Sequence, residues 1–298
     1  ILKASSSFNE ILGIPNNFGG VPNVEKCYDP KSKQHILDGT FPIQKDVTSE
    51  MNEFLDLLEK YNVEVLRPNN IPNLNQVFVR DISFTIENKL IIPNIIEDRK
   101  EEVEAISHIF KMIPEQNIIR MSENARAEGG DVMPWNDYIF VGYSQEEDFN
   151  IYKVARTNVE GVDFLKEQFP NKIVRAFELN KSDIDPKENA LHLDCCFQPI
   201  GTDCAIIYKG GFKNEEDVDF LVNLFLEENI IFISKEEMYH MNSNVFSISE
   251  KVIVSEKGFT RLNNQLRKRE FIVEEIQYSE ISKMEGLLRC STLPLKRK

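Results

Sequence analysis

Five residues in otherwise apolar segments have side chains that can take part in covalent or ionic chemistry. They are Asp81, Glu128, His192, Asp194 and Cys290. A cysteine thiolate attacks carbon well, and a nearby imidazolium or bound cation lowers the pKa of the thiol. Cys290 is therefore a candidate nucleophile, although a single cysteine more often serves only in packing.

His192 lies between two leucines in a predicted strand. Strand alternation would direct its side chain to the same face as that of Asp194, and a histidine and an aspartate on one polar face are less typical of packing than a lone histidine. Asp81 interrupts another apolar strand, where an acid marks either a solvated strand end or a site. Glu128 precedes two glycines, which would let the backbone approach a ligand closely or would form only a bulge or turn.

Carboxylates that share one cavity require a cation, because buried charges are normally paired. A planar guanidinium suits paired carboxylates, since it donates bidentate, charge-assisted hydrogen bonds. A divalent metal is the competing ligand, and it would fit Asp81, Glu128, Asp194 and His192. It would leave Cys290 without a role, and the sequence has no clustered metal-ligand spacing. We therefore expect neither a metal nor a cofactor.

A repeated pattern of predicted elements would bring these residues together. Four successive units each contain strand, turn, strand, helix and strand, with a period of about 40–50 residues, which is typical of propellers and arrays. Their opening strands are predicted at 77–84, 128–133, 191–197 and 244–248. The strand around Cys290 lacks a helix of its own. The N-terminal strand, helix and strand lack an opening strand, so the two parts together make a fifth unit.

Five units packed around an axis would place their five opening strands along one channel. Asp81, Glu128, His192 with Asp194, Asn244 and Cys290 would then face one another. The sequence therefore predicts one α/β domain over residues 1–298, a five-fold pseudosymmetric ββαβ propeller closed across the two termini. An ordinary α/β sheet with similar hairpins is the alternative.

Composition limits the classes of partner. The 298 residues carry 35 Lys and Arg against 49 Asp and Glu, a net charge of −14. Nucleic acids and anionic membranes demand basic surface, so neither is expected as a partner, whereas a small cationic substrate is compatible with this charge. No apolar run approaches the roughly 20 residues that span a bilayer, and no signal peptide is visible, so we expect a cytoplasmic location. A homo-oligomer is compatible with the sequence.

The cysteine count and one long loop complete the sequence evidence. Five cysteines without a CxxC spacing do not indicate a disulfide scaffold or a zinc site. Residues 16–40 are predicted to form a long polar loop, which is either a lid or solvated surface.

Taken together, these segments resemble the guanidine-modifying, or pentein, superfamily, which includes arginine deiminases, dimethylarginine dimethylaminohydrolases and arginine:glycine amidinotransferases. The motifs follow the family order over nearly the whole chain. They are Phe78-Val79-Arg80-Asp81, Glu128-Gly129-Gly130-Asp131, Arg156-Thr157-Asn158, His192-Leu193-Asp194 and Met284-Glu285-Gly286-Leu287-Leu288-Arg289-Cys290. The last resembles the dimethylarginine hydrolase ending. The His192 motif is closer to deiminases and amidinotransferases, and Ile11-Leu12-Gly13-Ile14-Pro15 is closer to amidinotransferases.

The resemblance implies a role for each motif. Cys290 would be the nucleophile, His192 the acid–base and Glu128 the catalytic glutamate. Asp81 and Asp194 would hold the guanidinium, and Arg156 the substrate α-carboxylate. Arg80 and Asn244 are further predicted substrate-binding residues.

The activity that this implies is hydrolysis of arginine or an arginine derivative. A covalent S-amidino intermediate on Cys290 would lead to a citrulline-type ureido product and ammonia or an alkylamine. An amidinotransferase that passes the amidino group to an acceptor amine such as glycine is the alternative. An inactive guanidine-binding protein is a second alternative.

Overall fold

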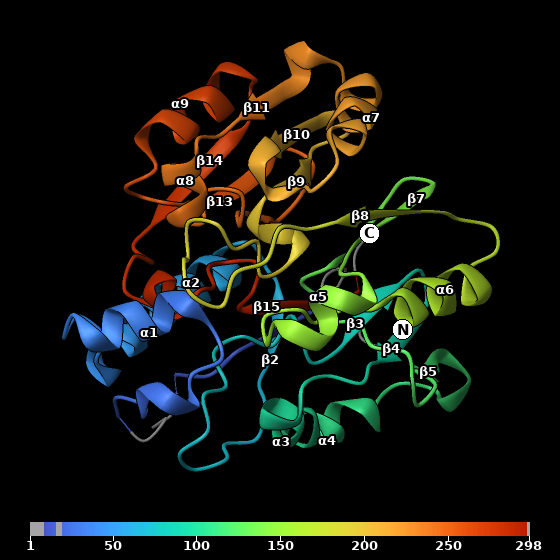
Figure 1. The fold of residues 1–298 in the computed structure, drawn as a ribbon. Coiled ribbons are helices and arrows are strands. Elements are labelled where there is room, and N and C mark those ends of the chain that lie inside the picture. The colour runs from blue at the N-terminus through green and yellow to red at the C-terminus, as the bar shows by residue number, and fades with distance from the viewer. Residues whose placement is uncertain (1–8, 16–19, 297–298) are drawn as a thin grey trace.

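Short apolar runs separated by turns form fifteen strands in the described part of the chain, residues 9–15 and 20–296 of a computed structural model (Figure 1). The strands are β1 (Asn9–Leu12), β2 (Glu64–Leu66), β3 (Phe84–Ile86), β4 (Lys89–Ile92), β5 (Ile118–Arg120), β6 (Val132–Trp135), β7 (Tyr138–Tyr143), β8 (Ile173–Glu178), β9 (Phe197–Ile200), β10 (Cys204–Ile207), β11 (Ile230–Phe232), β12 (Phe246–Ser247), β13 (Val252–Glu256), β14 (Ile272–Ile276) and β15 (Thr292–Lys296).

These strands make five three-stranded sheets with one shared topology. Four sheets use consecutive strands, β3-β4-β5, β6-β7-β8, β9-β10-β11 and β12-β13-β14, and the fifth has the order β15-β1-β2. In each sheet the middle strand pairs antiparallel with one neighbour and parallel with the other. The predicted α/β class is confirmed, and five similar sheets fit a five-fold pseudosymmetric arrangement.

The helices lie largely outside the sheets (Figure 1). They are α1 (Pro30–Leu37), α2 (Gln44–Lys60), α3 (Lys100–Ala105), α4 (Ser107–Phe110), α5 (Glu146–Ile151), α6 (Val159–Gln168), α7 (Glu215–Phe225), α8 (Lys235–Tyr239) and α9 (Thr260–Lys268). A parallel strand pair needs a crossover connection, which explains why helices follow the middle strands. The predicted N-terminal helix is confirmed as α2, which buries Val47, Met51, Phe54 and Leu58 completely.

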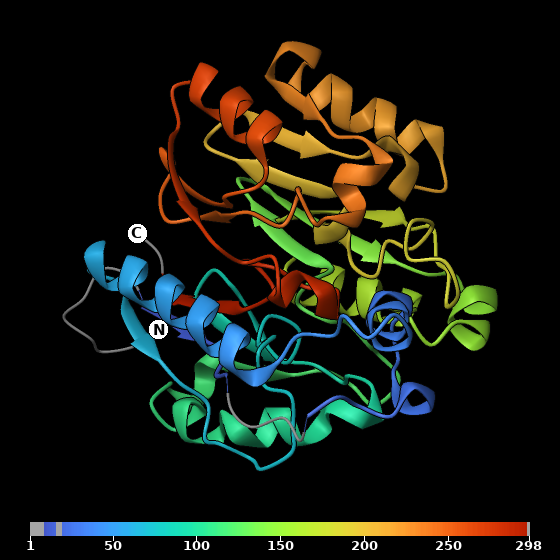
Figure 2. The ribbon, with the colours of Figure 1, turned by 90° about the vertical axis from the view of Figure 1, so that its left-hand side faces the viewer.

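The fifth sheet joins segments from opposite ends of the described chain. Strand β1 pairs antiparallel with β15, with Ile11 opposite Leu293, and pairs parallel with β2. Figure 2 shows the red strand β15 running through the middle of the molecule. Ile11 and Leu293 are fully buried in one apolar cluster with Val79 and Ile82, so this sheet packs against the segment that leads into β3.

The predicted opening strands are shorter than expected, which corrects the local setting of the candidate residues. Strand β3 begins at Phe84, β6 at Val132, β9 at Phe197, β12 at Phe246 and β15 at Thr292. All the candidate residues, Asp81, Glu128, His192, Asp194, Asn244 and Cys290, therefore lie in turns before these strands. Backbone groups of these turns form hydrogen bonds with neighbouring turns instead of with an adjacent strand.

The strand alternation predicted for His192 and Asp194 is also wrong. Residues Leu193–Cys195 form a 3₁₀ turn, and His192 is the residue before it. A 3₁₀ turn has three residues per turn, so it does not place alternate side chains on one face. The two side chains consequently have different partners, as the site geometry shows.

The segment predicted as a polar loop over residues 16–40 contains helical structure. Residues 16–19 lie outside the described part of the chain, but Val24–Lys26 form a 3₁₀ turn and α1 follows. The Asp29 side chain caps α1 by accepting a hydrogen bond from the Ser32 amide at 2.6 Å, and Pro30 occupies the first turn. Aspartate followed by proline is a strong helix start.

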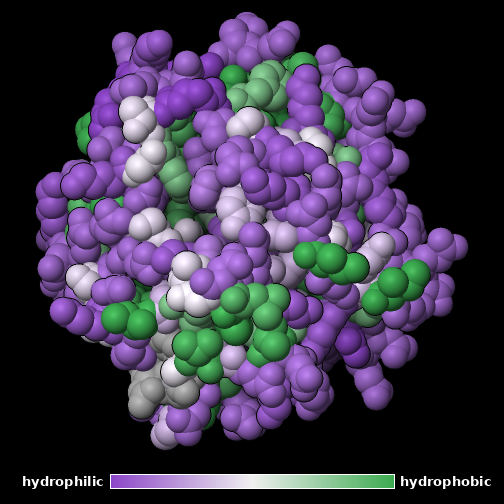
Figure 3. Space-filling view, turned by 60° about the vertical axis from the view of Figure 1, so that its left-hand side comes forward, coloured by the Kyte–Doolittle hydropathy of each residue, from purple (hydrophilic) through white to green (hydrophobic). Residues whose placement is uncertain are grey.

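Hydrophilic residues dominate the face of the molecule that Figure 3 shows. Hydrophobic residues gather near the lower edge of this face. Within residues 9–15 and 20–296, no helix has both the length and the apolar character needed to cross a membrane.

Candidate active site

The turns before the first strand of each sheet are linked to one another by hydrogen bonds. The bonds are Arg80 N to Cys290 O at 2.9 Å, Gly129 N to Asp81 O at 3.4 Å, Asp194 N to Gly130 O at 3.2 Å, Ser243 Oγ to Asp194 O at 2.9 Å and Arg289 N to Asn244 O at 3.4 Å. Residues from five distant parts of the chain are thereby brought into one cluster.

Two glycines make this close approach feasible. A Cβ atom on Gly129 would lie 2.1 Å from the Arg80 carbonyl oxygen. A Cβ atom on Gly130 would lie 2.7 Å from atoms of the His192 ring and 2.8 Å from Asp81 Oδ1. Gly129 and Gly130 form a turn, the second of the two alternatives considered, and this turn approaches neighbouring parts of the protein closely.

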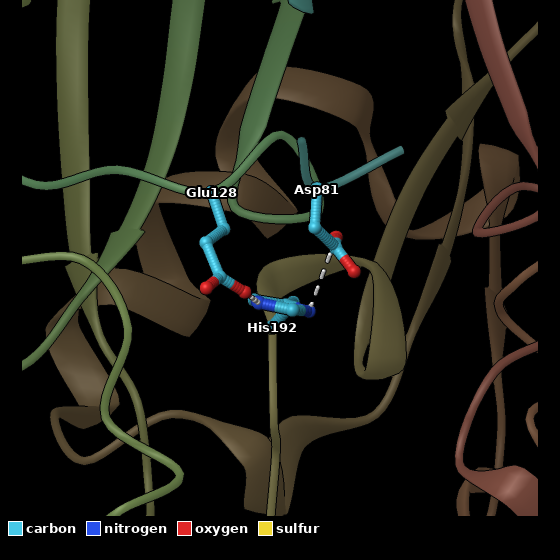
Figure 4. A group of neighbouring side chains, drawn as sticks. All are labelled: Asp81, Glu128 and His192. Atoms are coloured by element: carbon cyan, nitrogen blue, oxygen red, sulfur yellow. Dashed lines mark hydrogen bonds and ion pairs between the residues drawn. The ribbon is translucent and has the colours of Figure 1, made fainter. Parts of the chain in front are cut away.

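His192 lies between two carboxylates, as Figure 4 shows. Its Nε2 is 2.9 Å from Glu128 Oε2, and its Nδ1 is 3.6 Å from Asp81 Oδ1. Burial alone would lower the pKa of His192, but Asp81, Asp131 and Glu128 together raise it above the ordinary histidine value. Carboxylates on both sides of the ring favour the imidazolium, which can deliver a proton.

Glu128 is fully buried and is shared by His192 and Arg156. Arg156 Nη1 lies 3.2 Å from Glu128 Oε2. Although burial would raise the pKa of Glu128, the Arg156 guanidinium and His192 hold it well below the ordinary value. Arg156 is itself only 2% exposed, and its Nη2 has no hydrogen-bond partner. The Tyr28 ring lies 5.2 Å from the Arg156 guanidinium carbon.

Cys290 is held by Asn244 on two sides. Asn244 Nδ2 donates to Cys290 Sγ at 3.2 Å, and the Cys290 amide donates to Asn244 Oδ1 at 3.2 Å. Asp194 Oδ2 lies 3.7 Å from the sulfur. Burial, followed by the Asp194 and Asp81 carboxylates, raises the pKa of the Cys290 thiol well above its ordinary value. The sulfur is therefore a neutral thiol in the unliganded protein at neutral pH.

Asp194 and Arg80 contact the turn that carries Cys290. Asp194 Oδ2 accepts from Arg289 Nη1 at 2.6 Å, in an ion pair with both side chains at most 8% exposed. Arg80 donates from Nε to the Arg289 carbonyl at 3.1 Å and from Nη2 to Thr292 Oγ1 at 2.9 Å. These contacts place both residues beside the nucleophile, while their predicted substrate contacts stay predictions.

Arg99 is a buried residue of the site that the sequence reasoning missed. Its Nη1 contacts Asp81 Oδ2 at 2.7 Å, and its Nε contacts Glu102 Oε1 at 2.7 Å. It lies in the charged stretch Glu97–Glu102, which in sequence resembles a solvated helix start. Only the fold shows that this stretch packs against Asp81.

A cavity of about 220 Å³ opens onto these groups. Its polar lining includes Asp81, Arg99, Glu102, Arg156, His192 and Cys290, and its apolar lining includes Phe41, Leu74, Phe78, Leu191 and Met284. Lys26, Cys27, Tyr28 and Ser32 also line it, so part of the segment predicted as a loop over residues 16–40 borders the site. Glu128, Asp194 and Asn244 are completely buried behind the lining.

Three of these residues could also hold a metal. Ligand atoms of Asp81, Glu128 and His192 all lie within 4.8 Å of one another. Asp81 and Glu128 are already paired with Arg99 and Arg156, so neither carboxylate needs a metal as its partner. Cys290 also lines the cavity, and a thiol beside an acid–base residue is more typical of nucleophilic catalysis than of a metal site with oxygen ligands.

Comparisons with known proteins bear on this geometry. A protein-family model described as N,N dimethylarginine dimethylhydrolase, eukaryotic, matches residues 31–297. The chain is 31% identical over 268 residues to the uncharacterized protein YkgA of Bacillus subtilis, covering 90% of this chain and 86% of YkgA. It is 24% identical over 249 residues to the N(G),N(G)-dimethylarginine dimethylaminohydrolase of Pseudomonas aeruginosa, covering 81% and 85% of the two chains.

Solved structures share the fold at low sequence identity. The N-terminal domain of ArgZ, a cyanobacterial arginine dihydrolase with product bound, superposes with a TM-score of 0.78 at 16% identity and covers 98% of both chains. A variant of the Pseudomonas aeruginosa dimethylarginine enzyme, complexed with citrulline, superposes with a TM-score of 0.71 at 18% identity. It covers 96% of this chain and 98% of that one.

Proposed function

The chain belongs to the N,N dimethylarginine dimethylhydrolase family of the guanidine-modifying (pentein) superfamily, and on this premise we propose that it hydrolyses the guanidino group of arginine or an arginine derivative. The products are a citrulline-type ureido compound and ammonia or an alkylamine. One observation carries the proposal: Cys290, His192, Asp81 and an incompletely bonded Arg156 line the same small cavity.

We propose further that residues 1–298 form one catalytic domain, a propeller closed across the two ends of the chain. The pairing of β1 with β15 and the hydrogen bonds that link the five site turns support this arrangement. Closure matters for function because it sets Cys290, from the end of the chain, against Asp81 and His192 from earlier units.

In the proposed complex, the substrate guanidinium lies against Asp81 beside Cys290, with Glu128 and Asp194 supplying further negative charge. Arg156 binds the α-carboxylate, because its buried Nη2 lacks an acceptor and an unpaired buried donor is costly. Arg99 lines the same cavity, but its guanidinium is already paired with Asp81 and Glu102. Arg80 and Asn244 act on the substrate through the Cys290 turn that they contact.

The reaction begins with formation of the nucleophile. A bound guanidinium offsets the Asp81 and Asp194 charges that raise the pKa of Cys290, so substrate binding favours the thiolate and the thiol proton passes to solvent. The sulfur attacks the central guanidinium carbon to give a tetrahedral adduct. The His192 imidazolium then protonates the leaving nitrogen, and the C–N bond breaks to leave a planar S-amidino enzyme.

Hydrolysis completes the cycle. Neutral His192 takes a proton from water, and the resulting hydroxide attacks the amidino carbon. The C–S bond of this second tetrahedral adduct then breaks, its hydroxyl proton passes to solvent, and the ureido product and the Cys290 thiolate are released. Glu128, in contact with His192 at 2.9 Å, stabilises the imidazolium each time it forms.

A panel of guanidino compounds tests the proposal. Arginine, its Nω-methylated derivatives and shorter guanidino acids would each be incubated with the protein, and ureido product and released amine would be measured. We expect turnover of at least one α-amino acid in the panel without any added amine. Turnover only when glycine is added would identify a transferase instead. A complete lack of turnover, together with no labelling of Cys290 by a haloacetamidine, would contradict an enzymatic role.

A further inference from the structure

Lys181 is a buried lysine close to the proposed acid–base residue. Its side chain extends from the segment after β8, and the residue is only 9% exposed. The ammonium donates to the carbonyl oxygens of Ala190 at 2.8 Å and Leu191 at 2.7 Å. These are the two residues immediately before His192. Burial lowers the pKa of Lys181, a cost that the nearby Asp131 carboxylate partly offsets.

The backbone after His192 is also held by a buried charged side chain, that of Asp131. Asp131 Oδ1 accepts from the Leu193 amide at 2.9 Å, and its Oδ2 accepts from Thr157 Oγ1 at 2.7 Å. The same Thr157 oxygen accepts from the Glu128 amide at 3.2 Å. A chain of buried hydrogen bonds thus runs from the amide after His192 through Asp131 and Thr157 to the backbone of its partner Glu128.

The need for Lys181 follows from the local backbone. His192 is extended and the 3₁₀ turn Leu193–Cys195 follows, so the segment 190–192 lies outside every strand of the described chain. Buried carbonyls that lie outside a ladder require another donor. A lysine ammonium has three N–H donors, so it can donate a hydrogen bond to each of two carbonyl oxygens and hold both in place.

We propose that Lys181 is a positioning residue for His192, holding the two carbonyls before it while Asp131 holds the amide after it. Its effect on catalysis rests on the proposed function, but its effect on the histidine does not. Proton transfer depends on placement, and a misplacement of 1 Å can reduce rate about 100-fold.

The test uses three variants of the full chain. Lys181→Met keeps the length of the side chain and removes its donors, Lys181→Arg keeps a charged donor, and Lys213→Met is the matched control. Lys213 forms ion pairs with Asp148 and Glu178 near the same strand, without contacting the His192 segment. Measurements are kcat and KM with the best compound of the panel, and the pKa of His192 by NMR of histidine-labelled protein. The His192 signal, one of four histidines, is assigned with His192→Gln.

For Lys181→Met we expect kcat to fall about 10- to 100-fold with KM within about threefold. We also expect the pKa of His192 to fall, because a displaced ring loses contact with Glu128 and Asp81. Simple loss of a nearby cation would raise that pKa instead. Lys181→Arg should restore both quantities substantially, and Lys213→Met should change neither.

A His192 pKa that is unchanged or raised in Lys181→Met would overturn the proposal, as would an unchanged kcat. If this variant does not fold, Lys181→Gln, which keeps a shorter amide donor, should show the same two changes at smaller size. Should no compound be turned over, the titration alone still decides the role of Lys181, so the two failures are distinguishable.

Discussion

At the scale of single residues, the two proposed reacting groups differ in charge state before substrate arrives. Carboxylates on both sides of His192 raise its pKa and favour the imidazolium, whereas burial and nearby carboxylates raise the pKa of Cys290 and favour the thiol. Before substrate binds, the proposed acid, the His192 imidazolium, is therefore favoured, whereas the proposed nucleophile, the Cys290 thiolate, is not. A cationic substrate would lower the pKa of Cys290 by offsetting the nearby carboxylate charges, and would so favour the thiolate. This is why a cavity rich in carboxylates suits attack by a cysteine on a guanidinium.

Replacing the nucleophile should separate binding from chemistry. Cys290→Ser is expected to reduce turnover by roughly 10³-fold or more, since a serine hydroxyl ionises far less readily than a thiol. Substrate should still bind, because Asp81 and Arg156 are unchanged, and calorimetry would measure that binding. Cys204→Ser, on strand β10, is the matched control and should remain active. Normal turnover by Cys290→Ser would exclude the covalent route.

The raised pKa of Cys290 predicts a pH dependence of its modification. A group with a raised pKa keeps its proton as the pH passes the ordinary cysteine value, so the reactive thiolate appears only at higher pH. In the substrate-free protein, the rate of Cys290 alkylation by iodoacetamide should rise about tenfold per pH unit from pH 7 to above pH 9. Mass spectrometry would follow the peptide, with glutathione as reference. A rate that has already levelled off at neutral pH would show a thiolate in the free enzyme.

At the scale of elements, the turns before the strands matter more than the strands themselves. Strands β3, β6, β9, β12 and β15 begin two to four residues after the nearest candidate residue of each turn. Their sheets anchor the turns, while the turns bring carboxylate, imidazole and thiol together. Gly129 and Gly130 allow two such turns to approach closely enough for His192 to lie against Asp81 and Glu128.

Two neighbouring glycines should therefore respond differently to alanine. In Gly130→Ala the new methyl group meets the His192 ring and Asp81, which are side chains that can shift, so the protein should fold with kcat reduced about 10- to 100-fold. In Gly129→Ala the methyl group meets the Arg80 backbone, so folding itself should be impaired. Circular dichroism, thermal unfolding and kcat would be compared. Equal activity of Gly130→Ala and the native protein would show that His192 tolerates displacement.

At the scale of the whole molecule, Arg289 links turns that are far apart in the chain. Besides its ion pair with Asp194, it donates to the Val132 carbonyl at 3.1 Å and to the Gly130 carbonyl at 3.4 Å. It neighbours Cys290 in sequence, so the nucleophile is tied to two other sheets by one side chain. Buried ion pairs of this kind stabilise a particular arrangement more than they add to overall stability.

Arg289→Met tests this link. Removing one partner leaves Asp194 as an unpaired buried charge, and we expect a loss of about 3–5 kcal/mol in the free energy of unfolding. Arg261→Met removes the half-exposed pair with Glu237 and should cost less than about 1 kcal/mol. Denaturant unfolding of both variants provides the comparison. Similar small losses would mean that Arg289 does not hold the turns together.

The sequence alone was sufficient for the α/β class, for most elements and for the family. Apolar runs, turn residues and the spacing of α2 depend on local physics, and the chemically unusual residues stand out against apolar surroundings. The roles of Asp81, Glu128, His192, Asp194, Arg80, Arg156, Asn244 and Cys290 stay predictions until variants are measured.

Tertiary structure decided what each of these residues contacts. Strand alternation placed His192 beside Asp194, yet a 3₁₀ turn gives them different partners, and the Asp29 cap makes a helix within a segment rich in polar residues. Arg99, Arg289 and Lys181 resemble ordinary surface cations in sequence. Their importance depends on which carboxylates and carbonyls are buried beside them, and burial results from long-range packing that no local pattern records.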